Sequence, residues 1–445
     1  MKVVVVNSPL FRIPKKLEYR SSVPPIGLGL IATAIKNKGF SVELIDTNNN
    51  NFSLKKLISK IVNKKPDFVC TNVFTTNLEL VKELVESIYI KTHFIIGGLA
   101  TQYLYKDIFK WNSKNPIDII HGDGELITTD IIENNIKQNI SNKLKSKRYF
   151  KIDKSSEYFV RDINNEKLDR NFFTKEPQNN YFGFPEAHII TGRGCNYKCA
   201  FCAAARSLNS DYLIREKSTE SIISEIKHLQ SIYSNLKSIR ILDDLFLKNK
   251  KSIEKAINIF NKFDLKWRSM AHVFSFKDTN EDVIEKLKLN GCSELFIGID
   301  SGSQRILKKI HKIDNINLIK ENLTRLFKNS IPIKAYFIYG FPDETEEDFK
   351  LTYDLAEYLK MQSIKYHTSF RTSVFQFRPY HGTELYQYII AKKGKDAIKN
   401  MMKQNKELSE TIGRHEFNFQ SGNYSEADIK ILNDYIAKTI KLNEN

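Results

Sequence analysis

The sequence predicts an α/β protein in which two series of parallel strands follow one another and a mostly helical region ends the chain. Short apolar runs alternate with stretches of helical periodicity over residues 1–134 and again over 187–380, and this alternation is typical of parallel sheets built from βα units. A loop with three cysteines, TGRGCNYKCAFC, follows the first strand of the second series. With 445 residues and 41% apolar content, the chain can bury the cores of two or three domains.

The first series predicts a Rossmann-like domain over residues 1–134. Between its first two strands, a stretch with apolar residues at helical spacing follows a Pro-Pro pair and stops at Gly39. Such domains bind ligands at the carboxyl ends of the strands, where Gly97, Gly98 and Gly122 stand. Glycine there allows a large planar ligand or a phosphate to approach the backbone, although left-handed turns explain these residues equally well. The five expected strands are 3–7, 41–46, 67–72, 93–98 and 117–122.

The rest of the chain divides into three further parts. Residues 135–186 are rich in Asn, Lys, Ser and Asp with little periodicity, and we expect a linker there. Residues 187–380 predict a partial (β/α)6 barrel, with active-site groups at the carboxyl ends of its strands. Residues 381–445 are mostly helical in pattern, with candidate helices at 383–395, 397–410 and 425–442. The six expected barrel strands are 187–194, 238–244, 265–273, 294–300, 333–340 and 373–377.

The three cysteines of the loop indicate a metal centre. Three residues separate Cys195 from Cys199, and two separate Cys199 from Cys202. A structural zinc site needs a fourth ligand, yet no second C-x-x-C or C-x-x-H follows, and Cys70 and Cys292 stand far away in apolar surroundings. An iron–sulfur cube held by three cysteines leaves one iron without a protein ligand. An exogenous molecule is therefore expected at that corner.

The amino-acid composition indicates in which compartment the protein acts and which classes of partner it binds. No run of eighteen or more apolar residues exists and the N-terminus enters a strand directly, so we expect a cytoplasmic protein that is not bound to a membrane. The formal charge of +17 would suit nucleic-acid binding, but lysine is spread through nearly every segment and no separate basic tail is present. We interpret the charge as a compositional bias, with attraction to an anionic substrate or an acidic carrier as the alternative.

The spacing C-x-x-x-C-x-x-C, with Phe201 before the last cysteine, resembles the signature of the radical SAM superfamily, in which S-adenosylmethionine chelates the open iron of a [4Fe-4S] cluster. The stretches SPL…PPIGLGLIATAIKNKGFSVELID, PDFVCTNVFTTN, FIIGGLAT and IDIIHGDGEL resemble the cobalamin (B12)-binding domain found ahead of many radical SAM cores. The usual Asp-x-His-x-x-Gly loop is absent, since the first histidine of the chain is His93. The resemblance therefore implies either cobalamin without an imidazole from that loop, or an empty, vestigial domain.

The resemblance also implies which strand ends hold the cosubstrate. Asp243 and Asp244 match an acidic motif for the methionyl ammonium, with a helix N-cap as the alternative for one of them. In GIDSGSQRIL, Asp300 and Ser301 match the family's G-x-E-S-G-S and are expected at the ribose or the methionine portion, with aspartate where glutamate is usual. In YGFPDET, Gly340 matches G-F-P-x-E-T and is expected against adenine, while the residues after it begin the next helix.

Three residues are candidates for catalytic or substrate contacts. His272 stands where related sequences carry an arginine that meets the cosubstrate carboxylate, so it is a weaker carboxylate partner, a titratable group facing the substrate, or a packed core histidine. Arg268, expected on the same face of that strand, is the candidate to supply the missing charge. In RPYHGTELY, Tyr380 and His381 replace the second proline of the family's P-x-P-G-T-x-L-Y and are expected near the barrel mouth.

The function implied by the resemblance is that of a radical SAM enzyme with a [4Fe-4S] cluster and S-adenosylmethionine, and with cobalamin if the first domain is not vestigial. An electron donor such as flavodoxin or ferredoxin would reduce the cluster, and a 5′-deoxyadenosyl radical would activate an unactivated carbon of a small-molecule, natural-product-like substrate. Methyl transfer is the leading expectation, and dehydration, epimerisation or cyclisation without cobalamin is the alternative. An RNA-modifying methylthiotransferase is the remaining rival, but it predicts further cluster cysteines in the N-terminal domain, where Cys70 stands alone.

Overall fold

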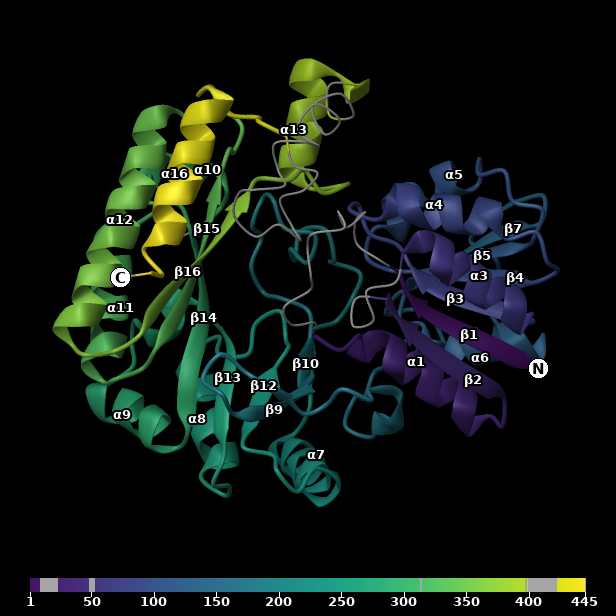
Figure 1. The fold of residues 1–445 in the computed structure, drawn as a ribbon, viewed down its shortest axis with the longest axis horizontal. Helices are drawn as coiled ribbons and strands as arrows, with labels where there is room; N and C mark the ends of the chain where they lie inside the picture. The colour runs from purple at the N-terminus through teal and green to yellow at the C-terminus, as the bar shows by residue number, and fades with distance from the viewer. Residues whose placement is uncertain (9–22, 48–52, 313, 397, 399–421, 445) are drawn as a thin grey trace. The chain divides into compact units, whose positions relative to one another are not determined.

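The structure of the chain, a computed structural model, describes residues 1–8, 23–47, 53–312, 314–396, 398 and 422–444. The chain divides into two compact units, and Figure 1 shows a sheet with flanking helices in each. No helix in these ranges is long and apolar enough to cross a membrane. The first unit comprises Met1–Glu176 and Asn209–Arg215, and the second comprises Pro177–Leu208 and Glu216–Asn445.

The sheet of the first unit contains the five predicted strands and two more. Its strand order is β2-β1-β3-β4-β5-β7-β6, and every neighbouring pair is parallel except β6 and β7. The valines of β1 are fully buried, because a parallel strand covered on both faces favours a continuous apolar run. The strands are β1 (Lys2–Asn7), β2 (Ser41–Asp46), β3 (Phe68–Asn72), β4 (His93–Gly97), β5 (Ile117–Gly122), β6 (Asn142–Leu144) and β7 (Lys147–Ile152).

Helices cover both faces of this sheet. Successive valines of β1 alternate between two cores, as the two-residue period of a strand requires. Val4 and Val6 pack with α3, α4 and α5, whereas Val3 and Val5 pack with α1 and α6. The helices are α1 (Ile26–Asn37), α3 (Leu54–Lys64), α4 (Leu78–Ser87), α5 (Thr101–Ile108) and α6 (Glu125–Glu133), with the short 3-10 helix η1 (Arg170–Phe172) later in the unit.

Residues 135–186 differ from the linker expected there. β7 runs parallel to β5 and places Phe150 and Ile152 in the core of the first unit. Tyr158 and Phe159, after the strand, are buried in the same core. The sequence pattern concealed this part of the sheet, because the apolar residues of KRYFKI are interspersed with basic ones and show no long apolar run.

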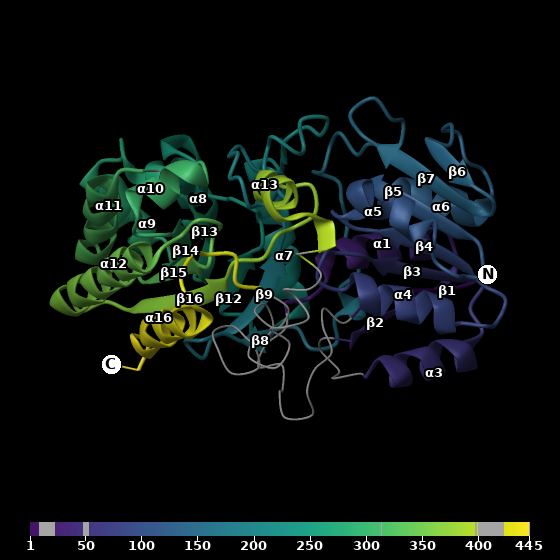
Figure 2. The same cartoon turned by 90° about the horizontal axis from the view of Figure 1, so that it is seen from above.

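The sheet of the second unit confirms the six parallel strands of a partial barrel. Its order is β16-β15-β14-β13-β12-β9-β8, with only the short β8 antiparallel to its neighbour. Figure 2 shows α9, α11 and α12 along the outer side of β13 to β16. The strands are β8 (Gln178–Asn179), β9 (Pro185–Ile189), β12 (Ser238–Ile241), β13 (Lys266–Ala271), β14 (Cys292–Asp300), β15 (Ile333–Tyr339) and β16 (Phe370–Gln376), and β10 (Gly192–Arg193) pairs with β11 (Arg215–Glu216) in a separate two-stranded sheet.

The helices of the second unit supply most of its large core. Apolar residues of α7, α8, α9, α11 and α12 pack against alternate residues of the strands. These helices are α7 (Thr219–Ile232), α8 (Lys250–Phe260), η2 (Val273–Phe276), α9 (Glu281–Leu289), α10 (Gln304–Lys309), α11 (Ile316–Lys328) and α12 (Glu346–Lys365).

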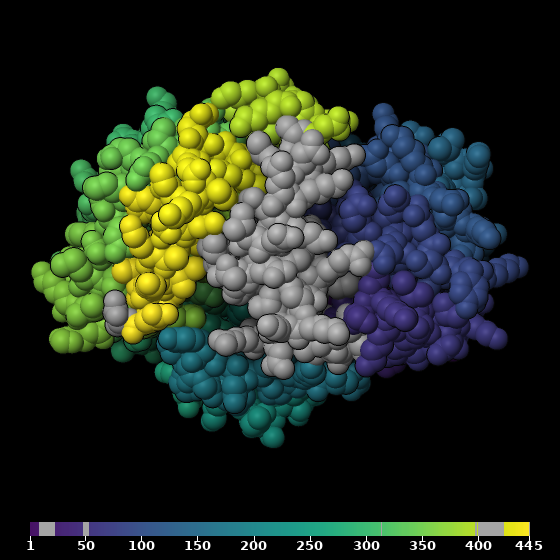
Figure 3. Space-filling view, turned by 45° about the horizontal axis from the view of Figure 1, so that its top comes forward, coloured from purple at the N-terminus to yellow at the C-terminus, as the bar shows by residue number. Residues whose placement is uncertain are grey.

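Two of the three predicted C-terminal helices are present, as α13 (Glu384–Lys393) and α16 (Ile429–Lys441). The third, predicted over 397–410, lies outside the described residues except for residue 398. α16 packs against α12 and β16, and its Thr439 hydroxyl lies 2.7 Å from the Tyr339 hydroxyl of β15. Figure 3 shows α16 on the surface of this unit.

Candidate active site

The cysteine loop lies at the carboxyl edge of the barrel sheet, directly after β9 and β10. Gly194 turns the chain with φ +95°, a left-handed conformation that favours glycine. The segment after α10 anchors the loop, because Ala200 donates its N–H to Ile310 O at 3.1 Å and His311 Nδ1 lies 3.3 Å from Lys198 O. Backbone contacts therefore fix the loop close to the end of α10.

The thiols of Cys195, Cys199 and Cys202 are free, and they lie close enough together to influence one another electrostatically. Burial is the largest influence and raises the pKa of Cys202 to about 12. Because a metal binds the thiolate, loading of this loop releases protons. Cys70 and Cys292 are buried in the apolar cores of the two units, so neither is available as a ligand.

The donor set fits an iron–sulfur cube better than a single metal ion. In the described part of the chain, no group of three or more His, Cys, Asp or Glu side chains is arranged to hold one ion. A cube does not need such convergence, since each thiolate binds a different iron. Three thiols on one anchored loop thus match a cube with one iron open to an exogenous ligand.

Asp243 and Asp244, which follow β12, contact different groups. Asp243 accepts hydrogen bonds from the N–H and the hydroxyl of Thr191, both at 2.6 Å, and so holds the segment that leads into the cysteine loop. Its burial raises the pKa of this carboxyl to about 6. Asp244 is exposed and accepts a hydrogen bond from the N–H of Gly194. The two bonds to Thr191 give Asp243 a structural role, and the expected cosubstrate contact stays a prediction for both aspartates.

Asp300 ends β14 with φ +69°, a strained conformation for aspartate, and its carboxylate lies 2.8 Å from Lys312 Nζ. Lys312 is buried beside Cys199 and Cys202. Burial lowers the pKa of Lys312, but Asp300 and the cysteines more than offset this effect and raise it above its ordinary value, so the side chain is charged. No sequence motif marked Lys312, because its place depends on the turn after α10 and the chain has lysine in nearly every segment.

Ser301 and the turn after β15 are occupied by contacts within the protein. The Ser301 hydroxyl lies 3.1 Å from the Thr352 hydroxyl of α12 and accepts a hydrogen bond from the N–H of Ser303 at 3.1 Å. This hydroxyl ties the loop to α12, and the expected contact of Ser301 with the cosubstrate stays a prediction. Gly340 has φ +91° and donates its N–H to Glu344 Oε2 at 2.7 Å, so the turn requires glycine whether or not adenine lies against it.

His272 follows β13 but does not titrate in the physiological range. Its Nδ1 accepts a hydrogen bond from the N–H of Phe274 at 3.2 Å, and its ring stacks on Tyr197 of the cysteine loop with the ring centroids 3.8 Å apart. Burial, together with the charge of Lys312, lowers the pKa of His272 to about 2. This low pKa disfavours the interpretation of His272 as a titratable group, and its contact with the substrate or the cosubstrate stays a prediction. His272 is a neutral ring that packs against the cysteine loop.

Arg268, in β13, does not replace the arginine charge that related sequences carry at the position of His272. Its guanidinium pairs with Glu186 of β9 and with Glu294 of β14, the latter at 2.9 Å. Glu294 also accepts hydrogen bonds from Arg371. Four residues of strand, roughly 13 Å, separate Arg268 from His272. This buried network of ion pairs therefore lies toward the amino ends of the strands, away from the cysteines.

Tyr380 and His381 follow β16 and are half-buried. The same segment is joined to the cysteine loop, because Leu385 donates its N–H to Ala200 O at 3.0 Å. Phe201 packs against Phe341, which follows β15, with the ring centroids 5.6 Å apart. The segment thus lies at the edge of the sheet where the substrate is expected, and the substrate contacts of Tyr380 and His381 stay predictions.

In the first unit, backbone packing explains two of the three predicted ligand-binding glycines. A Cβ on Gly98 would stand 2.4 Å from Val73 O, and a Cβ on Gly122 would stand 2.0 Å from Ile152 O. Both glycines also have positive φ. Gly97 has only one backbone oxygen near its Cβ position, at 3.9 Å, so its surroundings are more open. Contact with a ligand stays a prediction for all three.

The strand order of the first unit places its topological switch point between β1 and β3, where open α/β sheets bind ligands. Ser8 follows β1 there, and its buried hydroxyl has no hydrogen-bond partner among the described residues. Its N–H donates to Asn72 Oδ1 at 3.3 Å, and Asn7 donates to Asp46 at 2.8 Å beside it. An orphaned hydroxyl within this polar group fits a polar ligand. No sequence motif marked this hydroxyl, because the residues around Ser8 and Asn72 predict only the ends of strands.

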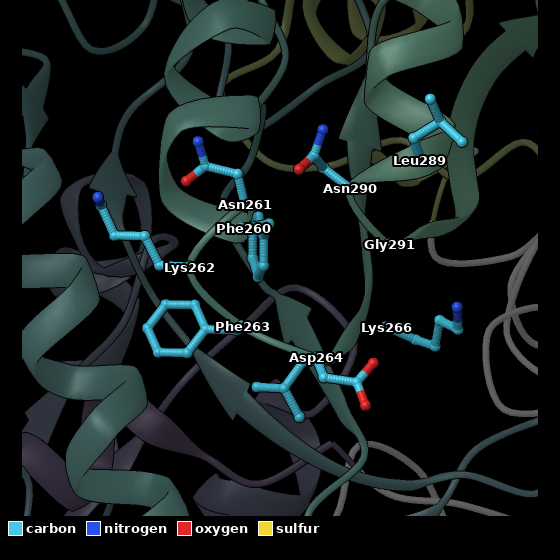
Figure 4. A pocket seen from close by; sticks show the side chains of 10 residues that line it. Phe260, Asn261, Lys262, Phe263, Asp264, Lys266, Leu289, Asn290 and Gly291 are labelled. Atoms are coloured by element: carbon cyan, nitrogen blue, oxygen red, sulfur yellow. The ribbon is translucent and has the colours of Figure 1, made fainter.

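A shallow recess lies at the opposite edge of the barrel sheet, and Figure 4 shows the side chains that line it. Residues 260–266, between α8 and β13, and residues 289–291, between α9 and β14, form its wall. Both turns precede their strands, so the recess lies at the amino edge of the sheet. The cysteine loop lies at the carboxyl edge, where barrel enzymes place their reactive groups.

Two family models match the sequence. The radical SAM superfamily matches residues 189–356, which include the cysteine loop and the ends of β12, β14 and β15. The B12 binding domain matches residues 16–132, which include β2 to β5. Together the two matches bear out the resemblances carried by the motifs.

Individual proteins with related sequences or structures support the same grouping. An uncharacterized methyltransferase, PH0819 of Pyrococcus horikoshii, is 26% identical over 88% of this chain and 83% of its own length. A putative methylthiotransferase, MJ0865 of Methanocaldococcus jannaschii, is 25% identical over 76% of this chain and 72% of its own length. The fold is similar to that of the radical SAM methyltransferase TsrM from Kitasatospora setae, with TM-score 0.62, 16% identity and coverage of 88% of this chain and 76% of TsrM. It is also similar to the cobalamin-dependent S-adenosylmethionine radical enzyme OxsB, with TM-score 0.61 and 17% identity; the match covers 90% of this chain but spans only 56% of OxsB.

Proposed function

Because this chain belongs to the radical SAM superfamily and carries a B12-binding domain, we propose that it methylates an unactivated carbon of a small-molecule substrate. The cofactors of this family are a [4Fe-4S] cluster, S-adenosylmethionine and cobalamin, and its members need a reductant. The observation that carries the proposal is the anchored loop of three free cysteines at the carboxyl edge of the barrel sheet, beside the charged Lys312. The name of the related methyltransferase favours methyl transfer over other radical chemistry.

When bound, the cluster supplies the electron that cleaves S-adenosylmethionine, and cobalamin supplies a transferable methyl group. The chain's own residues prepare the site for this chemistry. The ammonium of Lys312 favours the thiolate form of Cys199 and thereby cluster binding. Asp244 offers an exposed carboxylate for the methionyl ammonium, while Asp300 keeps Lys312 in place. The aromatic packing around Phe201 keeps water from one side of the loop.

The residues at the switch point of the first unit fit a ligand with many polar groups, such as cobalamin. The orphaned Ser8 hydroxyl and the Asn72 amide would hold polar side groups, and Gly97 leaves room near the backbone. No histidine precedes His93, whose Nε2 lies 3.0 Å from Asp118 Oδ2. Bound cobalamin should therefore show the spectrum of a base-off form without a protein imidazole from the usual loop.

The cluster assignment is tested by anaerobic reconstitution. We expect about four irons and four sulfides per chain. Replacing Cys195, Cys199 or Cys202 by Ala should abolish both iron binding and cleavage of S-adenosylmethionine. Cys70→Ala and Cys292→Ala are matched controls that should keep the cluster, and loss of iron in either one would contradict the assignment.

Product analysis of the reconstituted protein separates methyl transfer from its alternatives. Methylation through cobalamin should consume two molecules of S-adenosylmethionine per turnover, one giving S-adenosylhomocysteine and one giving 5′-deoxyadenosine with methionine. Protein that binds no corrinoid under conditions that load its cluster, or that forms 5′-deoxyadenosine without S-adenosylhomocysteine, would instead perform dehydration, epimerisation or cyclisation with a vestigial first domain.

A methylthiotransferase activity is disfavoured by the cysteine count. One of the related proteins is a putative methylthiotransferase, but that activity would call for further cluster cysteines in the N-terminal domain. The whole sequence has five cysteines, and the one in the first unit, Cys70, is buried in apolar surroundings. A second cluster found after reconstitution, as about eight irons per chain, would reverse this choice.

A further inference from the structure

Arg378 lies two residues beyond β16 and is only 6% exposed. Its buried Nε has no hydrogen-bond partner, and no carboxylate in the described part of the chain forms an ion pair with its guanidinium. Burial lowers the pKa of Arg378, although the side chain of an arginine remains charged in proteins. Removing one charge from water without a counter-charge costs several kcal/mol, so the fold carries an unfavourable feature here.

Tyr424 is a second buried donor without a partner beside this arginine. It is 2% exposed, and its hydroxyl bonds to no described residue. Burial raises the pKa of Tyr424 and the nearby Arg378 charge lowers it only in part, so the phenol stays protonated and can donate a hydrogen bond. A guanidinium offers only donors and a phenol hydroxyl adds another, so this point has donors to spare and no negatively charged acceptor.

The pair lies at the same edge of the sheet as the cysteine loop. Phe377, next to Arg378, donates its N–H to Tyr339 O at 2.7 Å and packs against Tyr424 with ring centroids 5.6 Å apart. Phe377 also contacts Phe341, with the ring centroids 5.2 Å apart. Phe341 in turn contacts Phe201, which precedes Cys202 in the cysteine loop. Direct packing therefore connects the arginine to the cysteine loop within one unit.

Other arginines of the same sheet show how this fold satisfies a buried guanidinium that has a structural role. Arg268 lies between Glu186 and Glu294, and Arg371 donates two hydrogen bonds to Glu294. Arg378 has no such carboxylate among the residues described. A buried guanidinium without a carboxylate partner, at the carboxyl end of a strand, is expected where a bound ligand supplies the negative charge.

We infer that Arg378 and Tyr424 form a binding site for an anionic oxygen group, a carboxylate or a phosphate, of a small molecule bound at the carboxyl edge of the barrel sheet. The inference rests on the proposed function in one respect: the small molecule is either the substrate or S-adenosylmethionine, whose methionine portion carries a carboxylate. Arg378 supplies charge and paired donors, and Tyr424 adds one neutral donor.

The first test measures stability and anion binding in reconstituted protein at constant ionic strength, with chloride as the reference anion and acetate and inorganic phosphate as probes. Acetate or phosphate should raise the melting temperature of the wild type. Arg378→Met should weaken binding of the probe at least tenfold, and Tyr424→Phe, which keeps the ring, should weaken it about threefold. Full retention of the anion effect in Arg378→Met overturns the inference.

The matched control is Arg268→Met, which removes a paired buried arginine. In chloride alone, Arg378→Met should leave the melting temperature unchanged or raise it, since an unpaired buried charge disappears, whereas Arg268→Met should lower it. An equal loss of stability in the two variants would show that Arg378 is a structural residue and would overturn the inference.

The source of the anion follows from the affinity for S-adenosylmethionine. A tenfold loss in Arg378→Met identifies the cosubstrate carboxylate as the ligand, and unchanged affinity together with loss of the acetate or phosphate effect identifies the substrate. Failure of the proposed function is seen separately, as absent iron or absent cleavage of S-adenosylmethionine in the wild type. If the wild type cleaves S-adenosylmethionine but binds neither acetate nor phosphate, only the inference about Arg378 and Tyr424 is overturned.

Discussion

Asp243 and Asp244 are adjacent in the sequence, yet their oxygens contact different groups. Asp243→Asn should cost about 1 to 3 kcal/mol of stability and reduce iron loading, because the amide nitrogen cannot accept a hydrogen bond from Thr191. Asp244→Asn should keep the cluster and weaken S-adenosylmethionine binding about tenfold, because the ammonium loses a charged acceptor. Denaturant unfolding, iron analysis and equilibrium binding measure these effects. Equal behaviour of the two variants in all three measurements would contradict the separate roles.

Glu344 is a fully buried carboxyl that gives the protein a specific pH dependence. Burial raises its pKa from 4.5 to about 8, because the N–H groups of Gly340 and Phe341 offset only part of the cost of burying the charge. Between these two values the unfolded chain loses a proton that the folded chain keeps, so the contribution of this residue to stability falls as pH rises. The effect is fully developed above about pH 8 and absent below about pH 4.5.

Glu344→Gln should therefore stabilise the protein relative to the wild type by an amount that grows with pH. We expect the difference in free energy of unfolding to increase by about 2 kcal/mol between pH 6 and pH 8. Denaturant titrations at several pH values measure it. Glu346→Gln, at an exposed position two residues later, is the control for the loss of one carboxylate. A difference that stays constant with pH would mean that Glu344 is already ionised in the folded protein.

Sequence motifs identified the site residues that follow strands but not the residues that complete their surroundings. The three cysteines, Asp244 and Asp300 stand in motifs with fixed spacing from a strand end. Lys312 lies beside the cysteines because the chain turns after α10, and no local sequence pattern predicts the direction of that turn. Ser301 and Asp243 matched their motifs, but a hydrogen bond to a residue about fifty positions away occupies each of them.

A buried hydroxyl pair joins helix α16 to β15. The Thr439 and Tyr339 hydroxyls are 2.7 Å apart, and both residues are fully buried. Thr439→Val should cost about 1 to 3 kcal/mol, because the Tyr339 hydroxyl is left without a partner. The double variant Tyr339→Phe/Thr439→Val should recover part of that loss, since no orphaned donor remains. Denaturant unfolding checks both values, and a double variant less stable than the sum of the single ones would contradict the pairing.

Strands with long apolar runs were predictable, and strands with mixed composition were not. β1 and β4 contain uninterrupted runs of buried apolar residues, and β5 has three buried isoleucines on either side of Asp118. β7 borders on the short β6 near the end of its sheet, and its KRYFKI pattern carries three basic residues among three apolar ones. Pairing with β5 is a long-range contact that composition within the segment does not express.

The chain as a whole consists of two units, each with its own parallel sheet and core. The alternation of apolar runs and helical segments along the sequence predicted both sheets, since each βα unit is encoded locally. The boundary between the units was harder to predict, because the chain leaves the second unit and returns to it. Residues Asn209–Arg215 belong to the first unit, although residues on both sides of them belong to the second.

The segment Asn209–Arg215, called the excursion below, limits how this chain can be recombined with related chains. His121, Asp123 and Lys151 of the first unit bond to Tyr212, Arg215 and Asp211 of the excursion, respectively. A crossover that exchanges only residues 1–176 would separate these side chains from their bonding partners. A chimaera that keeps the packing of the first unit must therefore carry over both residues 1–176 and the seven residues Asn209–Arg215, which are embedded in the segment for the barrel.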